Sequence, residues 1–266
     1  LLVNMFIMGK LSFHTLCVHA GTLIDPITQG VNTPIYPSTS YPYLDTDERS
    51  YPRYFNLPNQ KAVIEKLIVL EGCDPGTTEG ILFSSGMAAI STTLLGLLKS
   101  GEHVIFQRGL YGGTTHFISG WLKKYGIEWS FPASGEPEAF EQAIRPSTRM
   151  IYIETPSNPL LGITDIESIA RIAKKYGLIS VIDNTFASPV NQNPRLLGID
   201  VIIHSATKYL GGHSDICAGA LIAPTEIAKP LYKMALNLGG SLNPETCYLL
   251  ERSMKTLAIR VELQNN

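Results

Sequence analysis

Apolar runs that end in polar residues alternate with helical segments along most of this chain, and this alternation limits the possible folds. Runs typical of strands cover residues 80–83, 103–107, 149–154, 178–183, 200–204 and 219–223. Helical periodicity occupies 61–70, 86–99, 112–125, 165–176 and 225–238. Strands that alternate with helices predict an α/β fold with a mostly parallel sheet and right-handed crossovers. Because the strands are apolar throughout, we expect helices on both faces of the sheet.

The expected helix over 165–176 has clear signals at both ends. Thr164 is followed three residues later by Glu167, which is the spacing of a capping box, and Gly177 follows the last helical residue. The pattern therefore predicts that Thr164 caps this helix.

Composition excludes several classes of protein. Hydrophobic residues make up 44% of the 266 residues and charged residues 17%, which is typical of a globular chain and not of a disordered one. The net charge of −2 gives no reason to expect nucleic acid or an anionic membrane surface as a partner. The four cysteines are scattered without a Cys-x-x-Cys pair, so we expect buried thiols in a reducing compartment and no metal site.

Targeting signals are also missing from the sequence as it stands. No apolar run is long enough to cross a bilayer. The apolar stretch over residues 1–8 is short and lacks both a preceding basic region and a small-residue cleavage site, so a signal peptide is not expected. We infer a cytoplasmic protein.

Residues 1–60 differ from the rest of the chain. They contain many prolines and tyrosines and little periodicity, as in Thr33–Pro37 and Tyr51–Tyr54. This pattern indicates an extended arm that packs against its own domain or against a second subunit. We therefore divide the chain into an arm over 1–60, an α/β domain over 61–245, and the start of a linker helix over 246–266.

Polar residues suited to binding a ligand follow the first two strands. In open α/β sheets, ligands bind at the carboxyl ends of the strands. Gly86 and Met87 follow the strand over 80–83 and open a helix, where a glycine lets a phosphate approach backbone N–H groups. Tyr111 follows the strand over 103–107 and could lie flat on an aromatic ring. Taken alone, a glycine at such a place is usually just a turn residue, and a partly buried tyrosine at a helix start explains Tyr111 equally well.

Two later strand ends carry an amide and an acid. Asn158 lies in a proline-flanked turn after the strand over 149–154. Asparagine is a common turn residue. Its amide is also a neutral donor suited to a phenolate oxygen. Asp183 ends the apolar strand over 178–183. A cap or a solvated group is the ordinary alternative, but a buried carboxylate there needs a cationic partner, and a pyridinium nitrogen would serve.

Lys208 follows the strand over 200–204, within Ser205-Ala-Thr-Lys-Tyr-Leu-Gly-Gly-His213. A lysine among hydroxyls and glycines at a strand end is poorly placed for a core. It is well placed to form a Schiff base with an aldehyde cofactor such as pyridoxal phosphate (PLP), with hydroxyls nearby for the phosphate. The successive strand ends thus suit different edges of one cofactor.

From about His14 onward the chain resembles the Cys/Met-metabolism (trans-sulfuration) family of PLP enzymes. The family includes cystathionine γ-synthase, cystathionine β- and γ-lyases, methionine γ-lyase and O-acylhomoserine sulfhydrylases. Matching segments, in the family's order, are 31–36, 51–53, 84–87, 110–114, 154–159, 181–185 and 205–213. The resemblance implies the large domain of a fold-type I PLP-dependent transferase, like that of aspartate aminotransferase, with the C-terminal small domain largely absent.

The resemblance implies a role for each candidate residue. Lys208 looks like the Schiff-base lysine and proton shuttle, and Asp183 like the partner of the pyridine nitrogen. Tyr111 looks like the tyrosine that stacks on the ring and assists the leaving group. The remaining residues implied to bind the cofactor, by phosphate contact or near its 3′ oxygen, are Gly86, Met87, Ser205, Thr207 and Asn158.

Tyr51 and Arg53 match a Tyr-x-Arg pair that, in this family, reaches across a subunit interface to the neighbour's phosphate. The match implies a homodimer or a homotetramer with an active site shared between subunits. The partner expected in addition is a small amino-acid substrate, with no nucleic acid and no membrane.

The implied activity is that of a PLP-dependent lyase or transferase of sulfur amino-acid metabolism. A cystathionine β/γ-lyase or γ-synthase that cleaves or forms a C–S bond is the leading hypothesis. O-acylhomoserine sulfhydrylase and methionine γ-lyase are alternatives, the latter disfavoured because Gly113 stands where such enzymes typically place a cysteine. The family's arginine for the substrate carboxylate lies beyond residue 266, so we do not assign that role to Arg260. An aminotransferase and a truncated, non-catalytic remnant are the other hypotheses.

Overall fold

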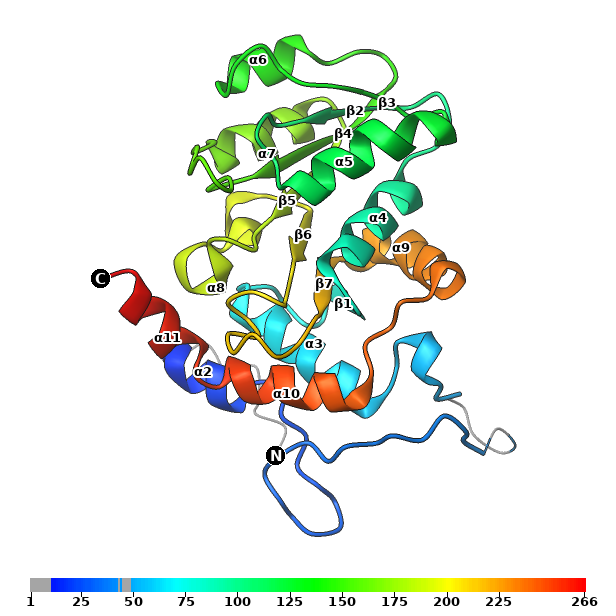
Figure 1. Ribbon diagram of the computed structural model, residues 1–266, viewed down its shortest axis with the longest axis vertical. Coiled ribbons are helices and arrows are strands. Elements are labelled where there is room, and N and C mark those ends of the chain that lie inside the picture. Colours follow the sequence, from blue (N-terminus) through cyan, green and yellow to red (C-terminus); the bar gives the residue numbers. More distant parts are fainter. Residues whose placement is uncertain (1–10, 43, 45–48) are drawn as a thin grey trace.

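The computed structural model describes residues 11–42, 44 and 49–266, so the apolar stretch over 1–8 and part of the predicted arm lie outside the described residues. Within them, seven strands form one sheet in the order β1-β7-β6-β5-β4-β2-β3 (Figure 1). β7 runs antiparallel to β1 and β6, and all other neighbours are parallel, which confirms the predicted α/β fold. The strands are β1 (Thr78–Phe83), β2 (His103–Phe106), β3 (Glu128–Ser130), β4 (Thr148–Glu154), β5 (Ile179–Asp183), β6 (Val201–His204) and β7 (Gly219–Pro224).

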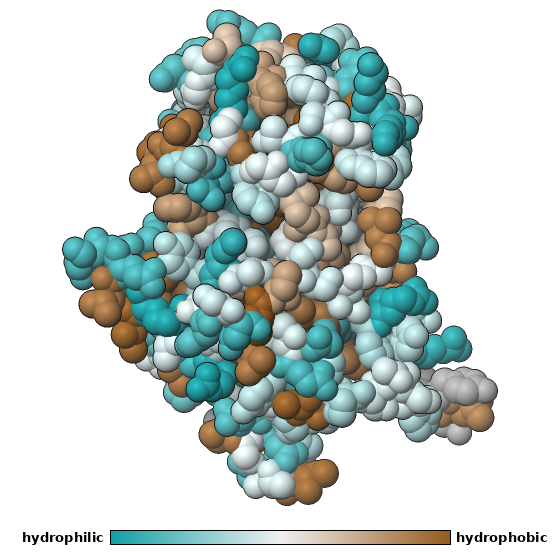
Figure 2. Space-filling view, in the orientation of Figure 1, coloured by the Kyte–Doolittle hydropathy of each residue, from teal (hydrophilic) through white to brown (hydrophobic). Residues whose placement is uncertain are grey.

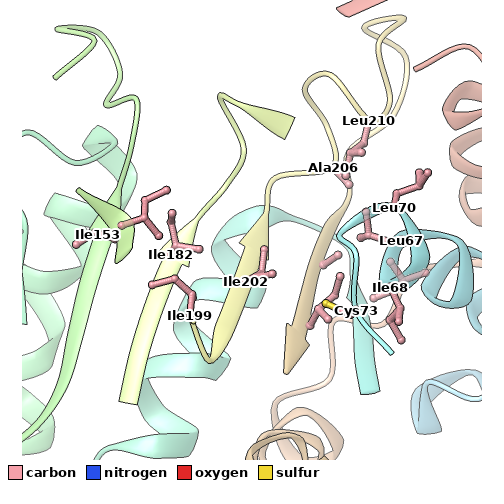
Figure 3. Close-up of a cluster of buried hydrophobic side chains, with 14 of the residues drawn as sticks. Leu67, Ile68, Leu70, Cys73, Ile153, Ile182, Ile199, Ile202, Ala206 and Leu210 are labelled. Carbon is pink, nitrogen blue, oxygen red and sulfur yellow. The ribbon is translucent and has the colours of Figure 1, made fainter. Parts of the chain in front are cut away.

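Helices cover both faces of this sheet, as the apolar strands predicted (Figure 1). Met150 and Tyr152 of β4 belong to one core, while Ile151 and Ile153 belong to the other, because successive strand residues point to opposite faces. Figure 3 shows the core that contains Ile153, called the second core below, in which apolar side chains of adjacent strands meet those of α3. The first face carries α4 (Gly86–Leu97), α5 (Gly112–Trp121) and α9 (Thr225–Leu238); the second carries α3 (Pro58–Leu70), α6 (Pro137–Gln142) and α7 (Ile166–Lys175).

Several short elements are absent from the sequence-based prediction. The helix expected over 112–125 is α5 followed by a 3-10 helix, η2 (Leu122–Tyr125). Along the chain, the edge strand β3 and helix α6 come between β2 and β4, and both are too short to give a clear periodic signal. The other short helices are η1 (Pro52–Tyr54), α8 (Ser188–Asn191) and η3 (Pro194–Leu197).

The predicted cap of α7 is wrong by one residue. The N-cap is Asp165, whose Oδ1 accepts a hydrogen bond from the backbone N–H of Ser168 at 3.0 Å. Thr164 is buried, and its hydroxyl donates to Oε1 of Gln107 at 3.0 Å instead. Tertiary packing thus directs the Thr164 hydroxyl to Gln107 at the end of β2, and the exposed aspartate next to it caps the helix.

The described part of the arm begins with a helix that the sequence pattern did not indicate, α2 (Phe13–His19). Nζ of the buried Lys66 donates to the carbonyl oxygen of Cys17 at 3.0 Å, which fixes the last turn of α2 on α3. Beyond α2 the chain forms a protruding loop (Figure 1), on which Ile27 and Val31 are 90% and 71% exposed. Figure 2 shows apolar surface at the tip of this loop.

The last described segment forms two helices, α10 (Pro244–Met254) and α11 (Leu257–Gln264). α10 packs on α3, and α11 lies beside α2 (Figure 1). Cys247, Leu250 and Met254 are buried in the second core, so this segment shares the core of the α/β domain. Its predicted role as a linker toward a further domain stays a prediction. Over the described ranges, no helix is both long enough and apolar enough to span a bilayer.

Candidate functional site

A cavity of about 830 Å³ lies where the parallel strands end, among the segments that follow β1, β2, β4, β5 and β6. Parallel strands deliver the residues after their carboxyl ends to the same edge of the sheet, which is why segments far apart in sequence meet here. The residues predicted from strand ends all line this cavity: Gly86, Met87, Tyr111, Asn158, Asp183, Ser205, Thr207 and Lys208.

Tyr51 and Arg53 are not among the residues that line the cavity. The Arg53 guanidinium lies over the rings of Tyr51 and Tyr54, and its Nη1 donates to the carbonyl oxygen of Leu236 at 2.7 Å. The structure therefore does not bring this pair to the cavity of its own chain. Their role toward a neighbouring subunit stays a prediction.

The N-terminus of α4 forms one wall of the cavity. Ser85 caps the helix: its Oγ accepts from the N–H of Ala88 at 3.1 Å. The N–H groups of Gly86 and Met87 belong to the first turn, where no intrahelical acceptor exists, so they can donate to an anion. A Cβ at Gly86 would lie 2.7 Å from Cβ of Ser205, which shows that only glycine lets α4 approach the Ser205 segment this closely.

The loop after β6 presents Lys208 to the same cavity. A tight turn holds it: the Lys208 N–H donates to the Ser205 carbonyl oxygen at 3.1 Å, and the Gly212 N–H donates to the Lys208 carbonyl oxygen at 2.7 Å. The Lys208 side chain is exposed toward the cavity, and among the described residues its Nζ makes no hydrogen bond. The Thr207 hydroxyl donates to the carbonyl oxygen of Ala218 at 3.2 Å, so its hydrogen is directed away from a ligand in this structure.

Asp183 ends β5 and is only 5% exposed. Its Oδ1 accepts from the backbone N–H of Thr185 at 3.1 Å. Burial raises the pKa of this carboxyl group above its ordinary value, whereas the hydrogen bonds from Thr185 and the nearby His204 imidazole lower it. Asp183 is thus a buried acid, and a cation in the cavity would stabilise its charged form.

Glu154 is a cavity residue to which the sequence analysis gave no role. It ends β4, and in the sheet register it is the direct partner of Asp183 on β5. Burial, and after it the negative charge of Asp183, raises the pKa of Glu154 to about 7. The criterion that selected Asp183, an acidic residue at the end of an apolar strand, also applies to Glu154 and could have found it.

Arg260 reaches the cavity from α11, and no strand-end signal could have placed it there. Its guanidinium donates to three protein oxygens: Nη1 to the carbonyl of Tyr209 at 2.9 Å, Nη2 to the carbonyl of Ser253 at 2.9 Å, and Nε to the hydroxyl of Thr256 at 3.1 Å. These contacts agree with leaving Arg260 unassigned as the substrate-carboxylate residue. Across the described residues, no cluster of metal-ligating side chains occurs.

The groups that line the cavity are suited to one ligand that carries several functional groups. A primary amine can react with a carbonyl group, a buried carboxylate can pair with a basic nitrogen, and the unpaired N–H groups of a helix N-terminus can bind an anion. Lys208, Asp183 and Gly86 supply these three groups within one cavity.

Comparisons with known proteins give relatives in sulfur amino-acid metabolism. The chain is 41% identical to cystathionine gamma-lyase of Bacillus subtilis over 93% of its length, and 39% identical to cystathionine beta-lyase MetC of the same organism over 94%. It spans only 65% and 64% of the length of these relatives. A probable cystathionine gamma-synthase of Herpetosiphon aurantiacus is 38% identical, over 94% of this chain and 77% of that protein.

Solved structures and a family model agree with these relatives. The crystal structure of cystathionine gamma-lyase from Lactobacillus plantarum complexed with L-serine superposes with a TM-score of 0.89 at 38% identity, covering 96% of this chain and 67% of that one. The crystal structure of metB from Corynebacterium glutamicum gives 0.88 at 36% identity, covering 95% and 66%. The family model matches residues 14–266. The chain therefore belongs to the Cys/Met metabolism PLP-dependent enzyme family, as its motifs indicated.

Proposed function

We propose that this chain binds PLP in the cavity at the strand ends and serves a trans-sulfuration enzyme that cleaves or forms a C–S bond. The substrate class is sulfur amino acids or activated homoserine. One observation carries the proposal: Lys208 and Asp183, which arise from different strands, line one cavity of about 830 Å³. The names of the relatives, cystathionine lyases and a probable synthase, support the substrate class.

The residues present fit the cofactor. Asp183 is buried, and within the described chain no cationic side chain hydrogen-bonds to it, so a protonated pyridine nitrogen would supply a partner that it lacks. The close approach of Gly86 to Ser205, where a Cβ would lie 2.7 Å from a side-chain carbon, forms a cradle of small groups suited to a phosphate.

Each residue then has a defined task. The Lys208 amine would hold the carbonyl carbon of the cofactor, and the same amine would accept and return the proton at the substrate α-carbon. Asp183 would pair with the ring nitrogen and keep it protonated, and the exposed ring of Tyr111 would lie against the cofactor and assist the leaving group. When bound, PLP supplies a ring that withdraws electrons from the α-carbon. The phosphate and the 3′ oxygen would be bound by Gly86, Met87, Ser205, Thr207 and Asn158, and Thr207 would have to turn its hydroxyl hydrogen away from the Ala218 carbonyl oxygen to do so.

The position of the leaving group is not fixed by these residues, so β-elimination, γ-elimination and γ-replacement are all candidate reactions.

We further propose that Tyr51 and Arg53 serve the phosphate site of a neighbouring subunit in a homodimer or homotetramer. The solvent-facing ring of Tyr51, 37% exposed, supports a contact beyond this chain. The cytoplasmic location stays a prediction.

Reductive trapping tests the cofactor site directly. The purified chain is incubated with PLP, reduced with borohydride and mapped by mass spectrometry. We expect a visible absorbance band before reduction and a label on Lys208 alone, while Lys208→Ala takes up no label and Lys99→Ala, which changes an exposed lysine, labels normally. A label on another lysine, or a folded chain that stays colourless, contradicts the proposal, and the colourless result favours the non-catalytic remnant.

Substrate assays separate the activities. Cystathionine, O-succinylhomoserine and O-acetylhomoserine are supplied to the loaded protein, and the keto acid, ammonia and thiol products are identified. Release of a thiol and ammonia supports a lyase, and a new C–S bond supports a synthase. Amino-group exchange without either product indicates an aminotransferase and contradicts the trans-sulfuration proposal.

A further inference from the structure

Glu154 joins two segments of the cavity wall that are not neighbours in sequence. Its Oε2 accepts from the backbone N–H of Tyr111 at 2.7 Å, and its Oε1 accepts from the backbone N–H of Asn158 at 3.1 Å. Tyr111 stands directly before α5, and Asn158 lies in the loop after β4. One carboxylate therefore holds both segments, with one oxygen for each.

The position of Glu154 makes this arrangement rigid. The residue is 4% exposed and ends β4, and its own backbone N–H and carbonyl oxygen pair with the Gln107 side chain at 3.2 and 2.7 Å. Tyr111, the N-cap residue of α5, makes no side-chain capping hydrogen bond. The carboxylate of Glu154 thus holds the backbone N–H at the start of α5.

The Tyr111 ring lies on this anchored backbone and is partly open to solvent. The Tyr111 side chain is 45% exposed, and it borders Gly113, where a built Cβ would lie 2.5 Å from its Cε1. A fixed backbone fixes the position of Cβ, from which the staggered rotamers place the ring, and the ring lies against Gly113 in the same segment. The group that fixes the Tyr111 N–H therefore limits where the ring can lie over the cavity.

We propose that Glu154 is a positioning residue that clips the Tyr111 and Asn158 segments together and thereby sets the placement of the Tyr111 ring over the bound cofactor. The effect on the cofactor rests on the proposed function, whereas the clip is a property of the chain alone. A carboxylate is required because two oxygens accept two N–H groups. A glutamine has one acceptor oxygen and leaves one of the two amides without a partner.

Backbone hydrogen exchange in the cofactor-free protein tests the clip. In the wild type we expect slow exchange at the amides of Tyr111 and Asn158. In Glu154→Gln at least one of the two exchanges faster, by about tenfold, the equivalent of about 1.4 kcal/mol. The amide of Thr185, which is bonded to Asp183, serves as the internal reference and stays protected. The matched control is Glu79→Gln, a glutamate exposed on strand β1.

The cofactor readout is the visible circular dichroism of bound PLP at saturation, which reports how the ring is held and not how much protein is folded. We expect Glu154→Gln to change the sign or halve the amplitude of this band, and Glu79→Gln to leave it unchanged. Unchanged exchange at both amides overturns the clip, and an unchanged band overturns its effect on the ring. If the wild type binds no PLP, the proposed function falls, while the exchange result still decides on the clip.

Discussion

Nε2 of His204 lies 2.5 Å from Oε1 of Glu71, and both side chains are buried. The same oxygen accepts from Nδ2 of Asn184 at 2.9 Å. His204 is the last residue of β6, and its imidazole lowers the pKa of Asp183 on the neighbouring strand. Glu71 on the chain segment after α3 therefore fixes a group that acts on the acid proposed to hold the cofactor.

Replacing Glu71 tests how much this pair stabilises the fold. Glu71→Ala leaves two buried donors, on His204 and Asn184, without their acceptor, so we expect the free energy of unfolding to fall by about 1–3 kcal/mol. The control is Glu226→Ala, which removes an exposed pair with Lys229 and changes the free energy by less than about 0.5 kcal/mol. Urea unfolding measures both, and equal effects would argue against the buried network.

Asp183→Asn should separate stability from cofactor binding. The substitution removes a buried negative charge, so the cofactor-free protein becomes more stable at pH 8. It also removes the proposed ionic partner of the ring nitrogen, so we expect PLP affinity to fall by about tenfold to a hundredfold, the loss expected for a charged hydrogen bond. Thermal unfolding and PLP titration check the two effects, with the exposed Asp74→Asn as control. Unchanged PLP affinity contradicts the role of Asp183.

Two adjacent glycines provide a matched test of the Tyr111 ring. A Cβ at Gly113 would lie 2.5 Å from Cε1 of Tyr111, whereas a Cβ at Gly112 meets nothing within 4 Å. Gly112→Ala should stabilise α5 by up to about 1 kcal/mol without changing PLP binding. Gly113→Ala should displace the ring and weaken PLP binding. Titration of both variants decides the matter, and equal affinities would show that the ring is not a cofactor contact.

The raised pKa of Glu154 predicts how stability depends on pH. The folded protein binds this proton more tightly than the unfolded chain, because the pKa rises from 4.5 to about 7. The contribution is fully present below pH 4.5 and is lost as the pH rises through 7. Relative to Glu154→Gln, the cofactor-free wild type should lose about 3 kcal/mol of unfolding free energy over this interval. Parallel pH profiles of the two proteins would refute this.

Arg53→Ala tests the proposed contact between subunits. If Arg53 serves a neighbour's phosphate, the variant should bind PLP more weakly, by about tenfold. Sedimentation of the same samples reports the oligomer, which we expect to be at least dimeric for the wild type. Arg149→Ala, which removes an exposed arginine paired with the half-buried Glu102, is the control. PLP affinity equal to that of the wild type would remove Arg53 from the site.

Much of the site could be predicted from the sequence because the ends of buried strands have a recognisable sequence pattern. An apolar run that stops at a polar residue marks where a buried strand reaches the edge of the sheet, and Lys208, Asp183 and Asn158 all follow such runs. Parallel order then places those ends together. Short elements gave no such signal: α2, β3 and α6 are held by tertiary contacts, and their sequences lack a period long enough to detect.

What the sequence by itself determined is the fold class, the family and eight of the residues that line the cavity, since each depends on local pattern and residue type. Only the tertiary structure decided which atoms meet. Glu154 accepts from the backbone N–H groups of Tyr111 and Asn158, and the Arg260 guanidinium donates to protein oxygens. Asp165, and not Thr164, caps α7. The physical reason is that a polar side chain takes the partner that packing brings within hydrogen-bonding distance, and residues distant in sequence supply that partner.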